Sequence, residues 1–183
     1  MTPLVSNLWP QFMVDPAFAA CFGQVIVEHA QMLRQERQVI FTLRSGAPLD
    51  KNLCARLLAS LQPDYEGFEL RIQNLFGYAM LDEAALRDLM EEMKRDGVPI
   101  NGFLDRCKIN IIGQKITIGV CHGTKFLQEM HFEKLLAERI AAHTGVTPQV
   151  TLQSAVSEAE QHQMEANVEI LNRELEKRTK ENV

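Results

Sequence analysis

Apolar residues recur at helical or strand spacing through the first 79 residues of the chain. Two stretches with helical spacing predict helices, the first of which ends at Asp15-Pro16. β-Branched residues and polar/apolar alternation predict three strands, and a polar turn at 34–37 joins the first two. In order, the predicted elements are a helix over 3–14, strands over 24–28 and 39–43, a helix over 49–61 and a strand over 68–72. Residues 1–79 are therefore expected to form one small α/β unit.

The next stretch, residues 80–153, predicts a second small unit with the order α-α-β-β-α-β. Its elements are a helix over 82–95, a short helix over 100–104, strands over 108–112 and 115–120, a helix over 124–143 and a strand over 147–152. Asp82 is the expected N-cap of the first helix, and Gly97 is its expected stop. Gly113-Gln114 separates two alternating runs and predicts a hairpin with a type II′ turn.

From Ser154 the composition becomes polar, and glycine, proline and aromatic residues are absent. Residues 154–183 therefore predict a solvated helical linker or tail. The fold class expected for the whole chain is α+β, with two small α/β units followed by a polar C-terminal helix.

Charge and hydropathy narrow the range of partners. The chain of 183 residues carries 19 Lys and Arg against 24 Asp and Glu, a net charge of −5. A strong grip on nucleic acid without sequence preference needs a basic surplus, which this chain lacks. No apolar run approaches the ~18–20 residues that cross a bilayer, and the N-terminus lacks the basic and apolar regions of a signal peptide. We expect a soluble, cytoplasmic protein that does not enter a membrane.

The sequence contains no recognised catalytic or metal-binding motif. Phosphate-binding loops, dinucleotide-binding glycine motifs, nucleophile elbows and zincin motifs are all missing. The four cysteines are far apart and predict free, buried thiols. Cys121 and His122 are adjacent on a predicted strand end, so their side chains point apart and do not form a nucleophile–base pair or a zinc site. We expect no catalytic residue, no metal and no cofactor in this chain.

A weak basic cluster is the one candidate binding site. Lys108 and Lys115 lie at the two ends of the hairpin, and Lys125 opens the helix that follows. They either solubilise a sheet edge or contact phosphates. Five residues of strand, about 17 Å, separate Lys108 from the turn, so Lys108 and Lys125 could share a phosphate while Lys115 stands apart. No aromatic residue lies on the hairpin, and base stacking is not expected there.

With these elements in order, the whole chain resembles the N-terminal, non-catalytic region of the PolC-type DNA polymerase III alpha subunit of Gram-positive-type bacteria. The similarity is carried by the leading segment up to Asp15-Pro16-Ala17-Phe18, the strands around Val25 and Phe41, the helix Leu49–Leu61, Phe103-Leu104, the run Lys108-Ile109-Asn110-Ile111-Ile112-Gly113-Gln114-Lys115-Ile116-Thr117-Ile118, the helix Phe126–Ala142 and the strand Val150–Leu152. The second unit carries most of it.

The resemblance implies a tau-type protein-interaction module at residues 1–79 and a KH-type fold at 80–153. In that family the tail leads to an OB domain and then to the exonuclease and DNA-directed DNA polymerase (nucleotidyltransferase) cores, whose acidic motifs have no counterpart here. The implied role is in DNA replication, through contacts with a replisome protein such as a clamp-loader tau-type subunit. KH domains grip nucleic acid with a Gly-x-x-Gly loop between two helices, and this chain has none. The alternative function is a weak single-stranded nucleic-acid-binding module that uses the Lys108/Lys115/Lys125 edge.

Overall fold

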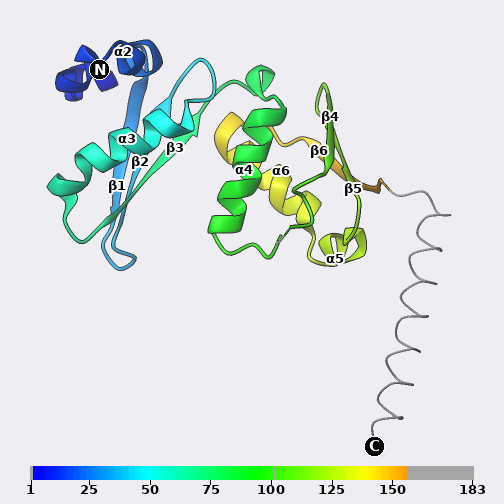
Figure 1. Cartoon of the computed structure of the whole chain (residues 1–183). Coiled ribbons are helices and arrows are strands. Elements are labelled where there is room, and N and C mark those ends of the chain that lie inside the picture. The colour runs from blue at the N-terminus through cyan, green and yellow to red at the C-terminus, as the bar shows by residue number, and fades with distance from the viewer. Residues whose placement is uncertain (1, 101, 156–183) are drawn as a thin grey trace, which may run out of the picture. The chain divides into compact units, whose positions relative to one another are not determined.

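The structure, a computed structural model, describes residues 2–100 and 102–155. It is a mixed α+β fold with two three-stranded sheets and several helices, as Figure 1 shows. The mixed α+β class expected from the sequence is therefore confirmed. The helix predicted over 154–183 lies almost entirely outside the described residues.

The N-terminal segment forms three short helices, so the single helix predicted over 3–14 is wrong. They are α1 (Val5–Leu8), the 3-10 helix η1 (Pro10–Val14) and α2 (Pro16–Phe22). Pro10 cannot donate a backbone hydrogen bond and opens η1 instead of continuing α1. Asp15-Pro16 begins a helix, because the Asp15 carboxylate accepts the Ala17 N–H at 2.9 Å and Pro16 has the backbone angle of a first helical residue.

The first sheet has the strand order β1-β2-β3, with β1 (Ile26–Leu33), β2 (Gln38–Arg44) and β3 (Glu69–Leu75). β1 runs antiparallel to β2, whereas β3 runs parallel to it. β1 extends five residues beyond its predicted end, up to the pair Leu33↔Gln38. Its second half is mostly exposed, so the ladder with β2, and not an apolar pattern, sets its length.

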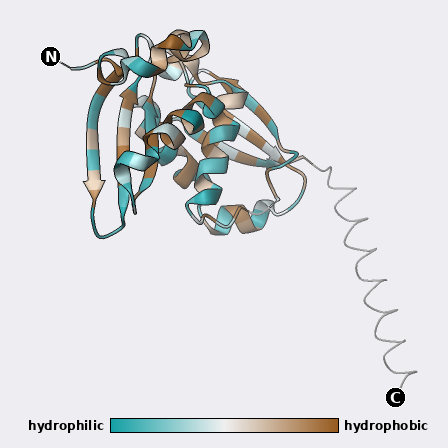
Figure 2. Ribbon diagram, turned by 60° about the vertical axis from the view of Figure 1, so that its left-hand side comes forward, coloured by the Kyte–Doolittle hydropathy of each residue, from teal (hydrophilic) through white to brown (hydrophobic). Residues whose placement is uncertain are grey.

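The core of the first sheet is centred on β2, as the alternation predicted. Val39, Phe41 and Leu43 are 0–3% exposed, and Figure 2 shows apolar and polar residues alternating along the strands. Helix α3 (Lys51–Leu61) contributes the buried Leu57 and Leu61, and the 3-10 helix η2 (Gln62–Tyr65) follows it. Asp50 caps α3 by accepting the Leu53 N–H at 2.8 Å, so this helix begins two residues later than predicted.

The 3-10 helix η3 (Tyr78–Met80) leads into helix α4 (Glu83–Arg95). Both predicted ends of α4 are confirmed: Asp82 accepts the Ala85 N–H at 2.8 Å, and Gly97 has a φ of +90°. The short helix predicted over 100–104 is wrong, because residues 102–106 form turns. Gly102 lowers the helix propensity of this short segment.

The second sheet has the order β4-β5-β6, with β4 (Lys108–Ile112), β5 (Lys115–Val120) and β6 (Gln149–Ser154). The hairpin β4–β5 has the predicted bounds, and Gly113 has the positive φ, +57°, that the first turn position requires. β6 runs parallel to β5.

The long helix predicted over 124–143 is instead two helices, α5 (Thr124–Glu129) and α6 (Phe132–Thr144). The break lies at Met130 and His131, and His131 has a φ of +56°. Leu127 and Phe132 are both fully buried, yet they are five residues apart and would face different directions on one continuous helix. The break is what allows both side chains to be buried.

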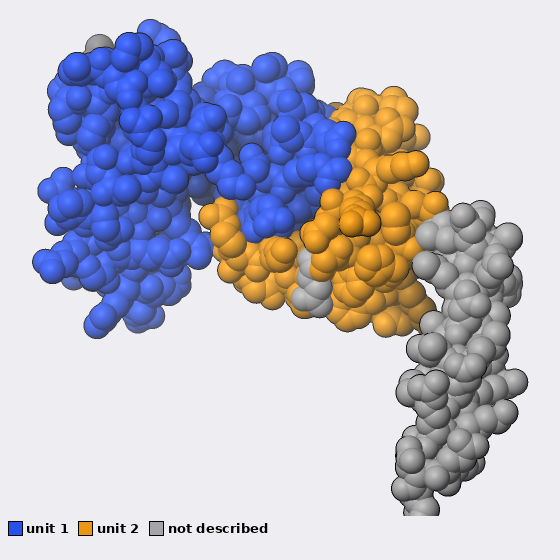
Figure 3. All heavy atoms as spheres, viewed as in Figure 1, with its two compact units in different colours: residues 1–93, 137–148 blue, residues 94–136, 149–183 orange. Residues whose placement is uncertain are grey.

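By its contacts the chain divides into two compact units, coloured in Figure 3. One comprises residues 1–93 and 137–148 and holds the first sheet. The other comprises residues 94–136 and the chain from 149 onward and holds the second sheet. The contiguous boundary expected between residues 79 and 80 stays a prediction, which limited proteolysis would test.

Candidate functional site

The three lysines of the predicted basic cluster fall into two groups. Lys108 is the first residue of β4 and pairs with Gly119, near the end of β5. Lys115 is the first residue of β5, beside the hairpin turn, and it pairs with Ile112 on one side and Gln149 on the other. Lys108 and Lys115 therefore lie at opposite ends of the second sheet, as the strand lengths predicted.

Lys125 lies at the same end of the sheet as Lys108. It is the second residue of α5, which follows β5 after the short loop 121–123, and Figure 1 shows α5 and the hairpin turn at opposite ends of β5. All three lysines are exposed, and within the described part of the chain none of them forms an ion pair. Lys108 and Lys125 thus form a candidate anion-contacting pair, and Lys115 is separate from it.

Three aromatic rings, which the sequence analysis did not single out as a site, meet at this same end of the second sheet. The Phe103 ring centroid lies 5.5 Å from that of His122, in an edge-on arrangement, and 5.5 Å from that of Phe126. Phe103 comes from the turns before β4, His122 from the loop after β5 and Phe126 from α5. A weak sequence signal was the pair Phe126-Leu127, because adjacent helical residues point about 100° apart and only a wide apolar face buries both.

Gly123 allows this ring cluster to form. It has a φ of +78°, and a Cβ atom built on it would lie 2.4 Å from Cδ1 of Phe103. The Phe103 ring therefore packs directly against the Gly123 backbone, where no side chain fits. Any other residue at this position would displace the ring and also strain the backbone.

The cysteines match their prediction only in part. All four are free, but Cys107 alone is buried, Cys21 and Cys54 are half-buried and Cys121 is exposed. Burial raises the pKa of the Cys54 thiol to about 12, which keeps it protonated and unreactive at neutral pH. In the described residues, no three His, Cys, Asp or Glu side chains gather as they would around a metal ion.

The turn between α5 and α6 contains no glycine. Its two residues are Met130 and His131, and Glu129 and Glu133 flank them. Backbone N–H groups that cradle a phosphate usually come from glycine-rich turns, and flanking carboxylates repel an anion. The turn is thus poorly suited to phosphate.

In the first unit, a buried histidine in the last turn of α6 contacts the end of β3. His143 is 6% exposed, its Nδ1 donates to the Asn74 carbonyl at 2.7 Å, and its Nε2 lies 3.2 Å from Oε2 of Glu92. The Asn74 amide in turn donates to Ser45 Oγ at 2.7 Å and to the Leu43 carbonyl at 3.3 Å.

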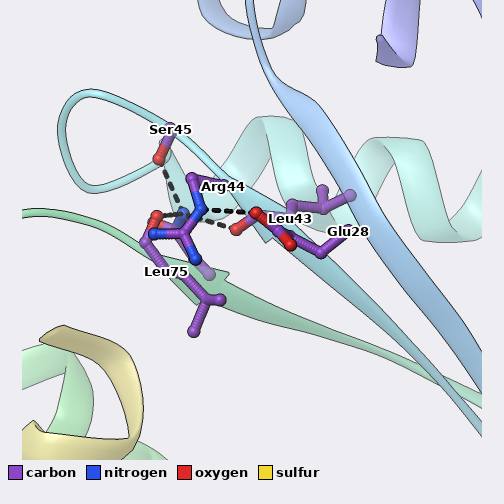
Figure 4. A network of polar contacts seen from close by, with 6 residues as sticks. Glu28, Leu43, Arg44, Ser45 and Leu75 are labelled. Atoms are coloured by element: carbon purple, nitrogen blue, oxygen red, sulfur yellow. Dashed lines mark hydrogen bonds and ion pairs between the residues drawn. The ribbon is translucent and has the colours of Figure 1, made fainter. Parts of the chain in front are cut away.

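Figure 4 shows the polar contacts at the end of β2, where Ser45 and Leu43 lie close to Leu75 and Arg44 forms an ion pair with Glu28 on β1. Every partner is a structural group of the first unit, so we assign the network to stability.

A shallow pocket of about 400 Å³ lies on the first unit, lined by Gln11, Phe12, Val14, Asp15, Phe18, Arg56 and Ser60. The Arg56 guanidinium carbon lies 4.8 Å from the centre of the Phe18 ring, and its Nη2 lies 2.9 Å from the Asp15 carboxylate. Since the one cation is already matched by a carboxylate and a ring, the pocket carries no free charge to select a charged ligand.

No helix within residues 2–100 and 102–155 has both the length and the apolar character needed to cross a bilayer. Comparison of the chain with protein-family models, with curated proteins and with solved structures finds no match.

Proposed function

We propose that this chain is the non-catalytic N-terminal region of a replicative bacterial DNA polymerase of the PolC type, and that it makes protein–protein contacts in the replisome. Residues 1–79 would be a tau-type interaction module and residues 80–153 a KH-type fold. The partner would be a replisome protein, such as a clamp-loader tau-type subunit.

The observation that carries this proposal is the element order of the second sheet and its helices. Two strands of a hairpin are followed by two successive helices, α5 and α6, and then by a strand parallel to the middle one. KH domains place their nucleic-acid-gripping loop between two successive helices. Here that position holds Met130 and His131 between two glutamates, which favours a KH-type fold used for protein contacts over one that grips phosphates.

A pull-down from bacterial lysate tests the proposal. The tagged full chain is incubated with lysate, with and without nuclease, and captured proteins are identified by mass spectrometry against the tag alone. We expect capture of a clamp-loader or other replisome subunit that survives nuclease treatment. Capture that disappears with nuclease, or no replisome protein in either arm, would refute it.

The second candidate function is weak binding of single-stranded nucleic acid at the Lys108/Lys125 end, with Lys115 contributing little. Lys108 and Lys125 favour it, because both are exposed at one end of the sheet and neither forms an ion pair with any other described residue. Two phosphates neutralised on a single strand give a salt slope of about −1.4. Fluorescence anisotropy with a labelled oligonucleotide tests it, because Lys108→Ala/Lys125→Ala should weaken binding while Lys115→Ala should not.

A further inference from the structure

The rings of Phe103, His122 and Phe126, which we call the ring cluster, are accessible to a ligand. His122 is exposed, Phe103 is half-buried and Phe126 has 42% of its surface exposed. Most of the other large apolar side chains in the second unit are buried, including Ile116, Ile118, Leu127 and Phe132, each 0% exposed. The ring cluster thus leaves aromatic surface exposed, whereas many apolar side chains of this unit are buried.

The ring cluster is also held in place without a ligand. Phe103 packs on the Gly123 backbone, and both of its ring neighbours lie at 5.5 Å, within the usual range for aromatic pairs. Rings that are fixed before binding lose little conformational freedom when a flat ligand packs on them.

Basic residues lie close in sequence to two of the three rings, or at the same end of the sheet. Lys125 directly precedes Phe126 in α5, Lys108 begins β4 at the same end of the sheet, and Arg106 is exposed in the turns that carry Phe103. The acidic residues closest in sequence are Asp105 and Glu129, so the local balance is three basic to two acidic groups in a chain of net charge −5. Exposed rings at the same end of a sheet as two lysines that form no ion pair with any other described residue match a ligand in which flat bases alternate with phosphates.

We infer that the ring cluster is a base-stacking site for single-stranded nucleic acid, with Lys125 and Lys108 contacting the flanking phosphates. This inference rests on the second function proposed above and extends it, because it assigns the bases to rings that lie outside the hairpin. Stacking on aromatic rings tolerates any base, so the site would bind single strands without marked sequence preference.

The test compares two labelled oligonucleotides of equal length and charge by fluorescence anisotropy with the full chain. One is oligo-dT and the other consists of abasic sites. Each stacked base is worth about 1–3 kcal/mol, so oligo-dT is expected to bind about fivefold more tightly than the abasic strand, or better. Phe126→Leu keeps an apolar side chain and should abolish that preference, and His122→Ala should reduce it.

Three further variants separate stacking from charge. Lys115→Ala removes an exposed lysine at the far end of the sheet and should leave the affinity for both oligonucleotides unchanged. Lys125→Ala should lower the affinity for both oligonucleotides equally. Ile112→Ala truncates another exposed apolar side chain, 68% exposed, and should leave the preference intact. The melting temperature of each variant verifies that it folds, and His122→Ala replaces Phe126→Leu as the main test if the latter unfolds.

The outcomes distinguish this inference from the function on which it rests. Equal binding of the two oligonucleotides, reduced by Lys125→Ala, would overturn the stacking site and leave the lysine contacts standing. Binding of neither strand would overturn both. If the chain binds neither oligonucleotide but captures a protein, and Phe126→Leu abolishes that capture, the inference is overturned and the ring cluster is a protein-docking surface.

Discussion

The imidazole Nδ1 of His143 donates a hydrogen bond of 2.7 Å to the carbonyl oxygen of Asn74, a residue 69 positions earlier in the chain. The Phe76 N–H donates to the His143 carbonyl at 3.0 Å, so the link runs in both directions. Glu92, on α4, lies 3.2 Å from the other ring nitrogen. One buried side chain therefore joins the end of β3, the last turn of α6 and the C-terminal part of α4 inside the first unit.

Replacement of this side chain should destabilise the protein. His143→Ala leaves the half-buried Asn74 carbonyl without its imidazole donor, and we expect the free energy of unfolding to fall by about 1–3 kcal/mol in urea denaturation. His122→Ala is the control, because His122 is exposed and its ring packs edge-on against Phe103. Equal losses in the two variants would show that the His143 contacts contribute nothing specific.

The packing of Phe103 on Gly123 can be measured with a pair of glycine variants. Gly123→Ala adds a Cβ where the Phe103 ring lies, whereas Gly97→Ala adds one in open space at a similar φ of +90°. Both variants strain the backbone, and Gly123→Ala should lose a further 1–3 kcal/mol, roughly the cost of overpacking. Urea denaturation of the two variants measures this difference, and a difference near zero would mean that the Phe103 ring moves aside freely.

The thiols should react in an order set by their burial. Cys121 is exposed, Cys107 is 4% exposed, and burial raises the pKa of Cys54 to about 12. Only the thiolate reacts with iodoacetamide, so we expect Cys121 to be alkylated well before Cys54 and Cys107. Mass spectrometry of peptides over a time course measures the order. In urea all four cysteines should react at similar rates, and early labelling of Cys107 in the native protein would contradict the fold around β4.

The contribution of Asp15 should depend on pH with a definite sign. The Asp15 carboxylate accepts hydrogen bonds from the Arg56 guanidinium and from the Ala17 N–H. These two hydrogen bonds hold the pKa of this carboxyl below its usual value of 3.8. The stabilisation is complete above the unfolded pKa and is lost as the pH falls through the folded one. Asp15→Asn should therefore lower the melting temperature at about pH 7 and have little effect at about pH 2.

Asp64→Asn is the matched control for this pH dependence, because Asp64 is exposed and has no ion-pair partner among the described residues. Its effect should be small at both pH values. An Asp15→Asn effect that grows as the pH falls would reverse the sign and contradict the ion pair with Arg56.

Local signals predicted the elements that local forces define. The β4–β5 hairpin has its predicted bounds because Gly113 sets the turn and the alternation sets the faces. Gly97, with its positive φ, likewise sets the end of α4 at Arg95. The break at His131 was missed because the apolar spacing continues across it, and only the tertiary burial of Leu127 and Phe132 requires it.

The candidate site was predictable in its charges but not in its rings. The separation of Lys108 from Lys115 follows from strand length alone. Phe103 and His122 are brought together by turns whose geometry depends on Gly123 and on long-range packing. The spacing of residues in the sequence does not predict that contact.

The two sheets share one connectivity, and this has a consequence for the route of folding. In each sheet, a hairpin pairs two strands that are neighbours in sequence. The third strand pairs with the middle one after a long connection that contains helices, as in Gln38↔Glu69 and Lys115↔Gln149. Hairpins form within about 1–10 μs, and pairing between distant segments is slower because loop closure comes first. β2 and β5 therefore acquire their local partners early and their parallel partners late. Substitutions in the hairpins should change the folding rate, whereas those in β3 and β6 should mainly change the unfolding rate.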